Sequence, residues 1–192
     1  MNLKNKRIGF AITGSFCTFH TALICAEEIA LLGAQLTSIL SNNTATVDTR
    51  FMPAEYLKNS LTEICGRPPI CTITDAEPIG PSKLFDLLLV LPATGNTIGK
   101  LANGITDTPV CMAVKSHLRN NRPVVLAIST NDALGGSAVN IGQLLNAKNF
   151  YFVPFAQDDP INKPKSMVFT KDMVIPAIVE ALEGRQLQPI LT

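Results

Sequence analysis

Short apolar runs alternate along this chain with longer segments in which apolar residues recur at helical spacing. Four of the runs have the length and composition of strands that are buried on both faces. A fifth run is similar but aromatic, and a weaker one lies between the second and the third. The predicted strands cover residues 7–13, 35–40, 86–91, 123–128 and 150–154, with the weaker strand at 70–73.

The segments between these runs predict amphipathic helices. The first begins near Phe19, keeps apolar residues on one face and ends at Gly33, a residue suited to a helix C-terminus. Repeated strand–helix–strand alternation implies right-handed crossovers, and therefore an α/β fold with a parallel sheet and helices on both faces. The Pro- and Lys-rich loop at 158–166 lies too near the end to divide the chain, so we expect one domain over residues 1–192. The other predicted helices cover residues 53–65, 98–103, 108–120, 138–147 and 171–183.

Composition narrows the class of protein. Of the 192 residues, 46% are hydrophobic and 16% are charged, which suits a substantial core and indicates that other subunits cover part of the surface. We therefore expect a homo-oligomer. The net charge of +1, with both signs interspersed, provides no basic face for nucleic acid.

The cysteines and the N-terminal residues indicate in which cellular compartment the protein is found. Five irregularly spaced cysteines fit reduced thiols better than a disulfide framework or a metal site. The basic N-terminal residues are not followed by a signal-peptide pattern, and no apolar run reaches the ~18 residues that cross a membrane. The sequence predicts a cytoplasmic protein that binds no metal, no nucleic acid and no membrane.

The loop after the first strand has the composition of an anion site. In a parallel sheet, ligands bind at the carboxyl ends of the strands, so these loops are the ones to inspect. Gly14 allows a tight turn, and Ser15 and Thr18 open a helix whose N–H groups favour an anion. Because the dinucleotide and Walker fingerprints are both absent, a mononucleotide is favoured over NAD or ATP. The alternative is an ordinary turn in which Ser15 caps the helix.

Three further polar loops follow the other strands. Ser41 opens a run of short polar side chains, suited to a ribityl chain or phosphate or to a plain loop. After the third strand, Lys100 lies one turn inside a helix, where a cation opposes the dipole, so either an anionic partner or a surface salt bridge is expected. A glycine-rich polar loop at 129–137 follows the fourth strand. Four such loops at one end of one sheet predict a bound polar ligand.

These loops carry a family resemblance. The segment PATGNTIGKLANGITD at 92–107 resembles the PASANT-type motif of the homo-oligomeric flavin-containing decarboxylase superfamily, and Asn131 falls where that superfamily has its PAMN loop. Closer still, ITGSFCTF, TRFMPAEYLKN, RNNRPVVLAISTNDALG, FVPFAQDDP and the ending LQPILT together resemble the dipicolinate synthase B-subunit family. That resemblance runs from about Lys6 to the last residue.

The resemblance implies a Rossmann-like, three-layer α/β/α flavoprotein fold that binds FMN at subunit contacts. Some of the matching residues would contact the phosphate or the ribityl chain, and others would border the flavin ring. The residues it assigns to FMN are Gly14, Ser15, Phe16, Ser41, Pro92, Thr94, Gly95, Asn96, Thr97, Ser129 and Thr130.

Departures from the superfamily pattern bear on the reaction. The PAMN position reads Ser129-Thr130-Asn131, and the Ser-Ala of PASANT reads Thr94-Gly95. The decarboxylases also carry a catalytic histidine after the second strand, whereas residues 49–54 contain none. The two histidines of this chain, His20 and His117, lie in predicted helices and are interpreted as structural. Decarboxylation of a peptidyl cysteine is therefore not expected.

The B-subunit resemblance implies the oxidation of a cyclic dihydro- or hydroxytetrahydro-dicarboxylate to pyridine-2,6-dicarboxylate in the mother cell of a sporulating bacterium. The expected partner is the A subunit of the same synthase, which resembles NADP-binding dehydrogenases. The expected catalytic residues are Asn131, which would face the substrate, and the cations Arg50 and Lys100, which would bind its carboxylates. The alternatives are a flavin-dependent decarboxylase and a non-catalytic flavin-binding partner of the dehydrogenase.

Charged residues outside these loops have other expected roles. Arg119 and Arg122 precede a strand, so they are placed at the opposite end of the sheet, as helix C-terminal charges or subunit contacts. Asp158 and Asp159 are interpreted either as turn formers or as contacts to a neighbouring copy of the chain.

Overall fold

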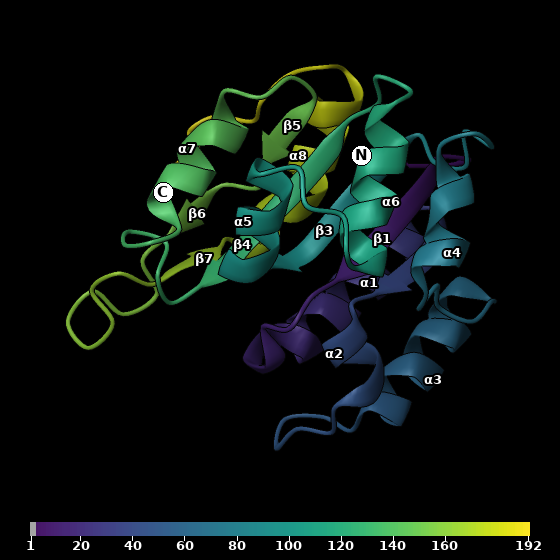
Figure 1. Ribbon diagram of the computed structural model, residues 1–192, viewed down its shortest axis with the longest axis horizontal. Coiled ribbons are helices and arrows are strands. Elements are labelled where there is room, and N and C mark those ends of the chain that lie inside the picture. Colours follow the sequence, from purple (N-terminus) through teal and green to yellow (C-terminus); the bar gives the residue numbers. More distant parts are fainter. Residues whose placement is uncertain (1–2) are drawn as a thin grey trace.

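The computed structural model describes residues 3–192, which form a mixed seven-stranded sheet covered by helices on both faces (Figure 1). The order of the hydrogen-bonded strands is β2-β1-β3-β4-β7-β6, and β5 also pairs with β4. Strands β1 to β5 pair in parallel, and β6 and β7 run antiparallel to their neighbours. The strands are β1 (Arg7–Ile12), β2 (Gln35–Leu40), β3 (Leu87–Ala93), β4 (Val124–Thr130), β5 (Phe150–Phe152), β6 (Phe155–Ala156) and β7 (Met167–Phe169).

The helices divide between the two faces because successive strand residues point to opposite sides. Leu89 of β3 joins the core cluster that includes residues of α1, α3 and α8, whereas Val90 joins the cluster formed with α4 to α7. In Figure 1, α4 to α7 lie in front of the sheet and α1 and α8 lie behind it. The helices are α1 (Phe19–Leu31), α2 (Asn42–Thr46), α3 (Ala54–Cys65), α4 (Ile73–Ala76), α5 (Gly95–Ala102), α6 (Pro109–Leu118), α7 (Ala138–Leu145) and α8 (Val174–Leu182).

Apart from the weaker strand, the predicted elements agree with this architecture in type and order. All seven residues of β3 are buried, as expected for a strand covered on both faces. Gly33 follows α1 with φ +87°, and Gly66 follows α3 with φ +66°, so both glycines end their helices in the left-handed region that a side chain would disfavour. Helix α5 begins at Gly95, three residues earlier than expected, because Thr94 caps it.

One expectation about the strands is wrong, and one feature of the sheet was not expected. The weaker strand at 70–73 does not form: Ile70 makes an isolated bridge to Ile39, and helix α4 begins at Ile73. The parallel sheet was predicted correctly for β1 to β5, but the antiparallel pairing of the carboxyl end of β4 with β7 was not predicted. The hairpin of β6 and β7 places its connecting loop, residues 157–166, at the carboxyl end of β4.

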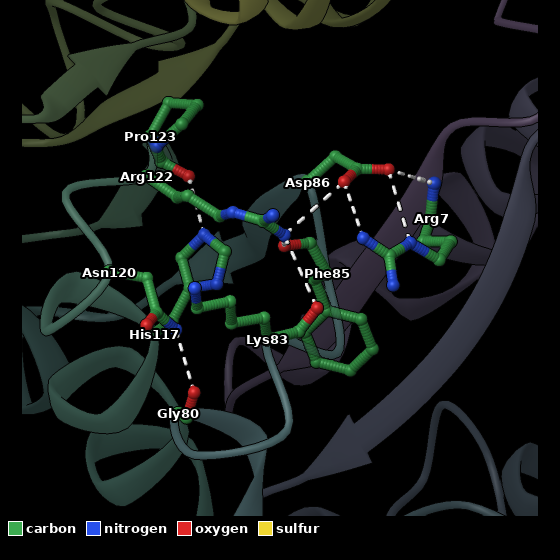
Figure 2. A network of polar contacts seen from close by, with 9 residues as sticks. All are labelled: Arg7, Gly80, Lys83, Phe85, Asp86, His117, Asn120, Arg122 and Pro123. Carbon is green, nitrogen blue, oxygen red and sulfur yellow. Dashed lines mark hydrogen bonds and ion pairs between the residues drawn. The ribbon is translucent and has the colours of Figure 1, made fainter.

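A polar network closes the opposite, amino end of the sheet (Figure 2). The Asp86 carboxylate accepts hydrogen bonds from the backbone N–H and the guanidinium of Arg7, at 3.0 and 2.7 Å, and from Arg122 at 3.2 Å. Partial burial works to raise the pKa of Asp86, but the hydrogen bonds and charges of Arg7 and Arg122 outweigh it and lower that pKa. Arg122 therefore lies at the end of the sheet where it was expected, engaged within its own chain.

His117 is a buried structural residue at the end of α6. Its Nε2 lies 3.1 Å from the carbonyl oxygen of Pro123, and its Nδ1 has no hydrogen-bond partner among residues 3–192. Burial lowers the pKa of His117 to about 4, so the imidazole is neutral at physiological pH.

Candidate functional site

The carboxyl ends of the central strands open onto a cleft of about 740 Å³. That volume lies within the range of small-molecule sites. Its walls come from the loops after β1, β3 and β4, from the segment after α2 and from the β6–β7 hairpin. The residues that line it are Gly14, Ser15, Phe16, Cys17, Arg50, Phe51, Thr94, Ser129, Thr130, Asn131, Asp158, Lys163, Ser166 and Val168.

Ser15 in the loop after β1 does not cap a helix. Neither Ser15 nor Thr18 makes a side-chain capping bond at the start of the 3₁₀ turn Phe16–Thr18 or of α1. The Ser15 hydroxyl instead lies 2.8 Å from the hydroxyl of Ser129, near the carboxyl end of β4. The interpretation of Ser15 as an N-cap is therefore wrong, and the first turn keeps N–H groups that no capping side chain occupies.

Thr13, a residue not predicted as part of the site, joins the loop after β1 to the loop after β3. Its hydroxyl donates to the carbonyl oxygen of Pro92 at 2.7 Å and accepts from the backbone N–H of Thr94 at 3.1 Å. Thr94 lines the cleft and caps α5 by accepting from the backbone N–H of Thr97. A hydroxyl directly after a strand whose last five residues are buried is the sequence signal that could have pointed to this contact.

Gly95 allows the loops after β3 and β4 to approach each other closely. A Cβ on Gly95 would lie 2.6 to 2.8 Å from the side-chain oxygens of Ser137, Asp132 and Thr130. These oxygens form a cluster in which Asp132 accepts from Thr130 at 2.5 Å and from Ser137 at 3.0 Å. The departure from the superfamily motif at Gly95 therefore provides space for a polar cluster behind the cleft wall.

Six of the fourteen predicted site residues lie outside the cleft lining: Ser41, Pro92, Gly95, Asn96, Thr97 and Lys100. Ser41 bonds locally, with its hydroxyl 2.9 Å from that of Thr44. Asn96 is exposed in the first turn of α5. Lys100 pairs with Asp107 at 2.6 Å, so the surface salt bridge is formed and a role of Lys100 toward substrate stays a prediction.

Ser41 was expected at the cleft, but the segment after α2 lines it instead, through Arg50 and Phe51. The Arg50 guanidinium lies 4.8 Å from the centre of the Phe51 ring. Phe51 is 49% exposed, an uncommon state for a large aromatic side chain. The cleft therefore combines a cation with an exposed apolar ring on this wall.

The hairpin wall carries an ion pair between Asp158 and Lys163, with their charged atoms 3.0 Å apart. A hydrogen bond from Ser166 and the charge of Lys163 lower the pKa of Asp158 despite its partial desolvation. The expectation that Asp159 forms a turn is met by its carboxylate, which accepts from the backbone N–H of Asn162 at 3.1 Å.

Other kinds of site are not found in the described part of the chain. It contains no group of three or more metal-ligating side chains, and all five cysteines are free thiols. None of its helices combines the length and apolarity needed to cross a membrane.

Comparison with known proteins places this arrangement in a family. A family model described as Flavoprotein matches residues 1–181. The chain belongs to the flavoprotein family. This flavoprotein is 47% identical over 191 residues to the B subunit of dipicolinate synthase from Bacillus subtilis (strain 168), covering 99% of this chain and 95% of the relative.

Solved structures agree with that assignment. The crystal structure of the dipicolinate synthase B subunit from Bacillus halodurans C has a TM-score of 0.92 and 42% identity, covering 100% of this chain and 98% of the other. The FMN-dependent cysteine decarboxylase SpaF has a TM-score of 0.64 at 16% identity, covering 93% and 98%, a likeness that shows the fold alone. The matches confirm the three-layer flavoprotein fold and the B-subunit resemblance that the sequence predicted.

Proposed function

We propose that this flavoprotein is the B subunit of a dipicolinate synthase and takes part in oxidising a dihydro- or hydroxytetrahydro-dipicolinate precursor to dipicolinate. The observation that carries the proposal is the 47% identity to the Bacillus subtilis protein over 99% of the chain. We place the protein in the mother-cell cytoplasm of a spore-forming bacterium. The whole chain acts in this proposal as one flavoprotein domain.

FMN is the proposed cofactor, and the cleft has the chemistry to hold it. The uncapped first turn after β1 and the paired hydroxyls of Ser15 and Ser129 offer donors to a phosphate or ribityl chain. Gly14 leaves its surroundings open, since a Cβ there would meet only the Phe16 ring at 3.6 Å. Thr94 and Thr130 are proposed to border the flavin ring.

The other residues predicted to bind the cofactor lie behind the cleft wall or outside the cleft. Pro92 and Gly95 shape the loop behind the cleft, and Thr97 completes the cap of α5. Ser41 and Asn96 stay proposed FMN contacts outside the cleft lining of the single chain, where a flavin at a subunit contact would reach them.

A bound flavin supplies hydride-accepting chemistry, while the protein supplies orientation and electrostatics. Arg50 presents a permanent positive charge to a substrate carboxylate. Asn131 is exposed in the cleft, where its amide can donate to and accept from the substrate. The cleft lining includes no histidine, which disfavours the decarboxylase alternative.

The proposed partners are the dehydrogenase-like A subunit of the synthase, which would bring NADP, and further copies of this chain. Exposed apolar side chains on the α5–α7 face, among them Val139 at 65% exposure, agree with a surface that is covered in an assembly.

The test is a visible spectrum of the chain purified alone, with flavin quantified per chain. We expect stoichiometric flavin that bleaches anaerobically when the precursor is added. Flavin that bleaches only when the dehydrogenase-like partner is present would favour a non-catalytic role, and a preparation that neither retains nor rebinds flavin would overturn the cofactor assignment.

A further inference from the structure

Two cationic side chains reach the cleft from opposite ends of the strand order. Arg50 follows α2 beside β2, at one edge of the sheet, and Lys163 lies on the hairpin of β6 and β7, at the other edge. The two segments flank the carboxyl ends of the central strands (Figure 1). Both side chains line the same cleft, although they lie 113 positions apart in the sequence.

The segment that carries Arg50 is anchored on both sides. The Thr49 hydroxyl accepts from the backbone N–H of Met52 at 3.1 Å, and Met52 is buried. Asp48 accepts from the backbone N–H of Ala54 at 2.8 Å, which fixes the start of α3. Arg50 therefore projects from an ordered turn, and it forms no ion pair within residues 3–192.

The loop that carries Lys163 is also held in place. Gln157 donates to the carbonyl oxygen of Pro164 at 2.8 Å, and the backbone N–H of Lys163 donates to the carbonyl oxygen of Asp159 at 2.8 Å. The backbone N–H of Leu134 donates to the carbonyl oxygen of Lys165 and ties the loop to the segment after β4. The backbone at Lys163 is therefore held in place by the fold.

The ion pair between Lys163 and Asp158 is weak enough for a substrate carboxylate to replace Asp158. The side chains of Lys163 and Asp158 are 56% and 30% exposed, and ion pairs with that exposure contribute little stability. Ser166 lines the same cleft and its hydroxyl also lowers the pKa of Asp158, so a polar side chain stays near this carboxylate after Lys163 leaves. An incoming carboxylate can therefore replace Asp158 at the Lys163 ammonium at small cost.

We propose that Arg50 and Lys163 each bind one carboxylate of a dicarboxylate substrate, and that Asp158 holds Lys163 until the substrate arrives. This inference rests on the proposed function, which takes the cleft as the substrate site. Two cations that line one cleft favour a ligand with two carboxylates, because a monocarboxylate leaves one of the cations without an anionic ligand.

The experiment compares Lys163→Met and Arg50→Met with the matched control Lys165→Met. Lys165 lies on the same loop and is exposed, but it does not line the cleft, so its variant removes the same charge from outside the site. Calorimetry measures the dissociation constants of pyridine-2,6-dicarboxylate and pyridine-2-carboxylate with each purified full-length protein. Flavin content and melting temperature are recorded on the same samples.

We expect the unmodified protein to prefer the dicarboxylate, and Lys163→Met and Arg50→Met each to weaken dicarboxylate binding by about tenfold or more and to reduce the preference. Lys165→Met should keep the preference. Asp158→Asn should strengthen dicarboxylate binding several-fold, because it frees Lys163, whereas a purely structural ion pair predicts no gain.

A preference unchanged in Lys163→Met, with no gain in Asp158→Asn, would overturn the inference. So would an unmodified, flavin-loaded protein that binds the two probes equally, a result that leaves the flavin assignment intact. Loss of flavin from every sample would count against the proposed cofactor instead. In those same samples, the preference for the dicarboxylate over the monocarboxylate would still decide whether Arg50 and Lys163 bind the two carboxylates.

Discussion

The hydroxyl oxygens of Ser15 and Ser129 lie 2.8 Å apart, although 114 residues separate them in the sequence. Ser15 follows β1 and Ser129 belongs to β4, and β3 lies between these strands. The loop after β1 therefore reaches across the end of β3 to contact the carboxyl end of β4. Two hydroxyls share one hydrogen bond and keep one further proton, which a phosphate or ribityl oxygen can accept.

Replacing Ser129 with alanine should weaken FMN binding while leaving the fold intact. The variant removes a donor from the cleft and leaves Ser15, which is half-buried, without its partner. We expect the dissociation constant for FMN to rise by about tenfold, measured by quenching of flavin fluorescence. Ser82→Ala, at an exposed serine away from the cleft, is the control. Equal FMN affinity in both variants would show that this hydroxyl pair does not bind the cofactor.

Gly95→Ala should disrupt the cleft. The added methyl group would lie within 2.8 Å of Asp132 and Thr130, so the loop after β3 or the loop after β4 must move. We expect a loss of about 1–3 kcal/mol in the free energy of unfolding, typical of overpacking, together with reduced flavin retention. Gly99→Ala in the same helix meets only Asn140, at 3.5 Å, and should be neutral or slightly stabilising. The prediction fails if the two alanine variants have the same stability and flavin content.

The parallel core of the sheet could be predicted from the sequence because its signals are local. A strand buried on both faces reads as a continuous apolar run, and β3 shows this along its whole length. The end of α1 at Gly33 was likewise marked by a residue type that tolerates φ of +87°. The gathering of the loops after β1, β3 and β4 at one site could also be predicted, because the carboxyl ends of parallel strands share one edge of the sheet.

The hairpin wall was not predicted because it depends on pairing between distant residues. Strand β6 has two residues and β7 has three, too few for a periodic pattern. Their location follows from β7 pairing with β4 beyond the end of β5, which no local signal specifies. The cleft role of Lys163 was missed for that reason, and Asp158 was considered only as a turn former or a contact between copies of the chain.

Acid should destabilise the fold through His117. Burial lowers its pKa to about 4 in the folded state from the ordinary value of 6.5. Between these values the unfolded chain binds a proton that the folded chain excludes, so stability falls as the pH drops below about 6.5 and the loss is complete below about 4. The total is about 3 kcal/mol. Urea unfolding between pH 7 and 5 measures the slope, and His117→Gln should flatten it; an equal slope in both proteins would contradict this account.

The amino-end network should stabilise the sheet more than an exposed ion pair does. Asp86 accepts from the backbone N–H and the guanidinium of Arg7, which begins β1, so Asp86→Ala removes this acceptor from both Arg7 donors (Figure 2). Arg122 also loses its bond to Asp86 but keeps the carbonyl oxygens of Lys83 and Phe85. We expect a loss of about 1 kcal/mol in the free energy of unfolding, since water still reaches part of the site. Glu55→Ala, which breaks the exposed pair with Lys58 on α3, should have a much smaller effect. This network lies at the opposite end of the strands from the cleft, so the Asp86→Ala variant should also retain its flavin. If the variant loses flavin in proportion to its loss of stability, the two ends of the sheet are coupled instead.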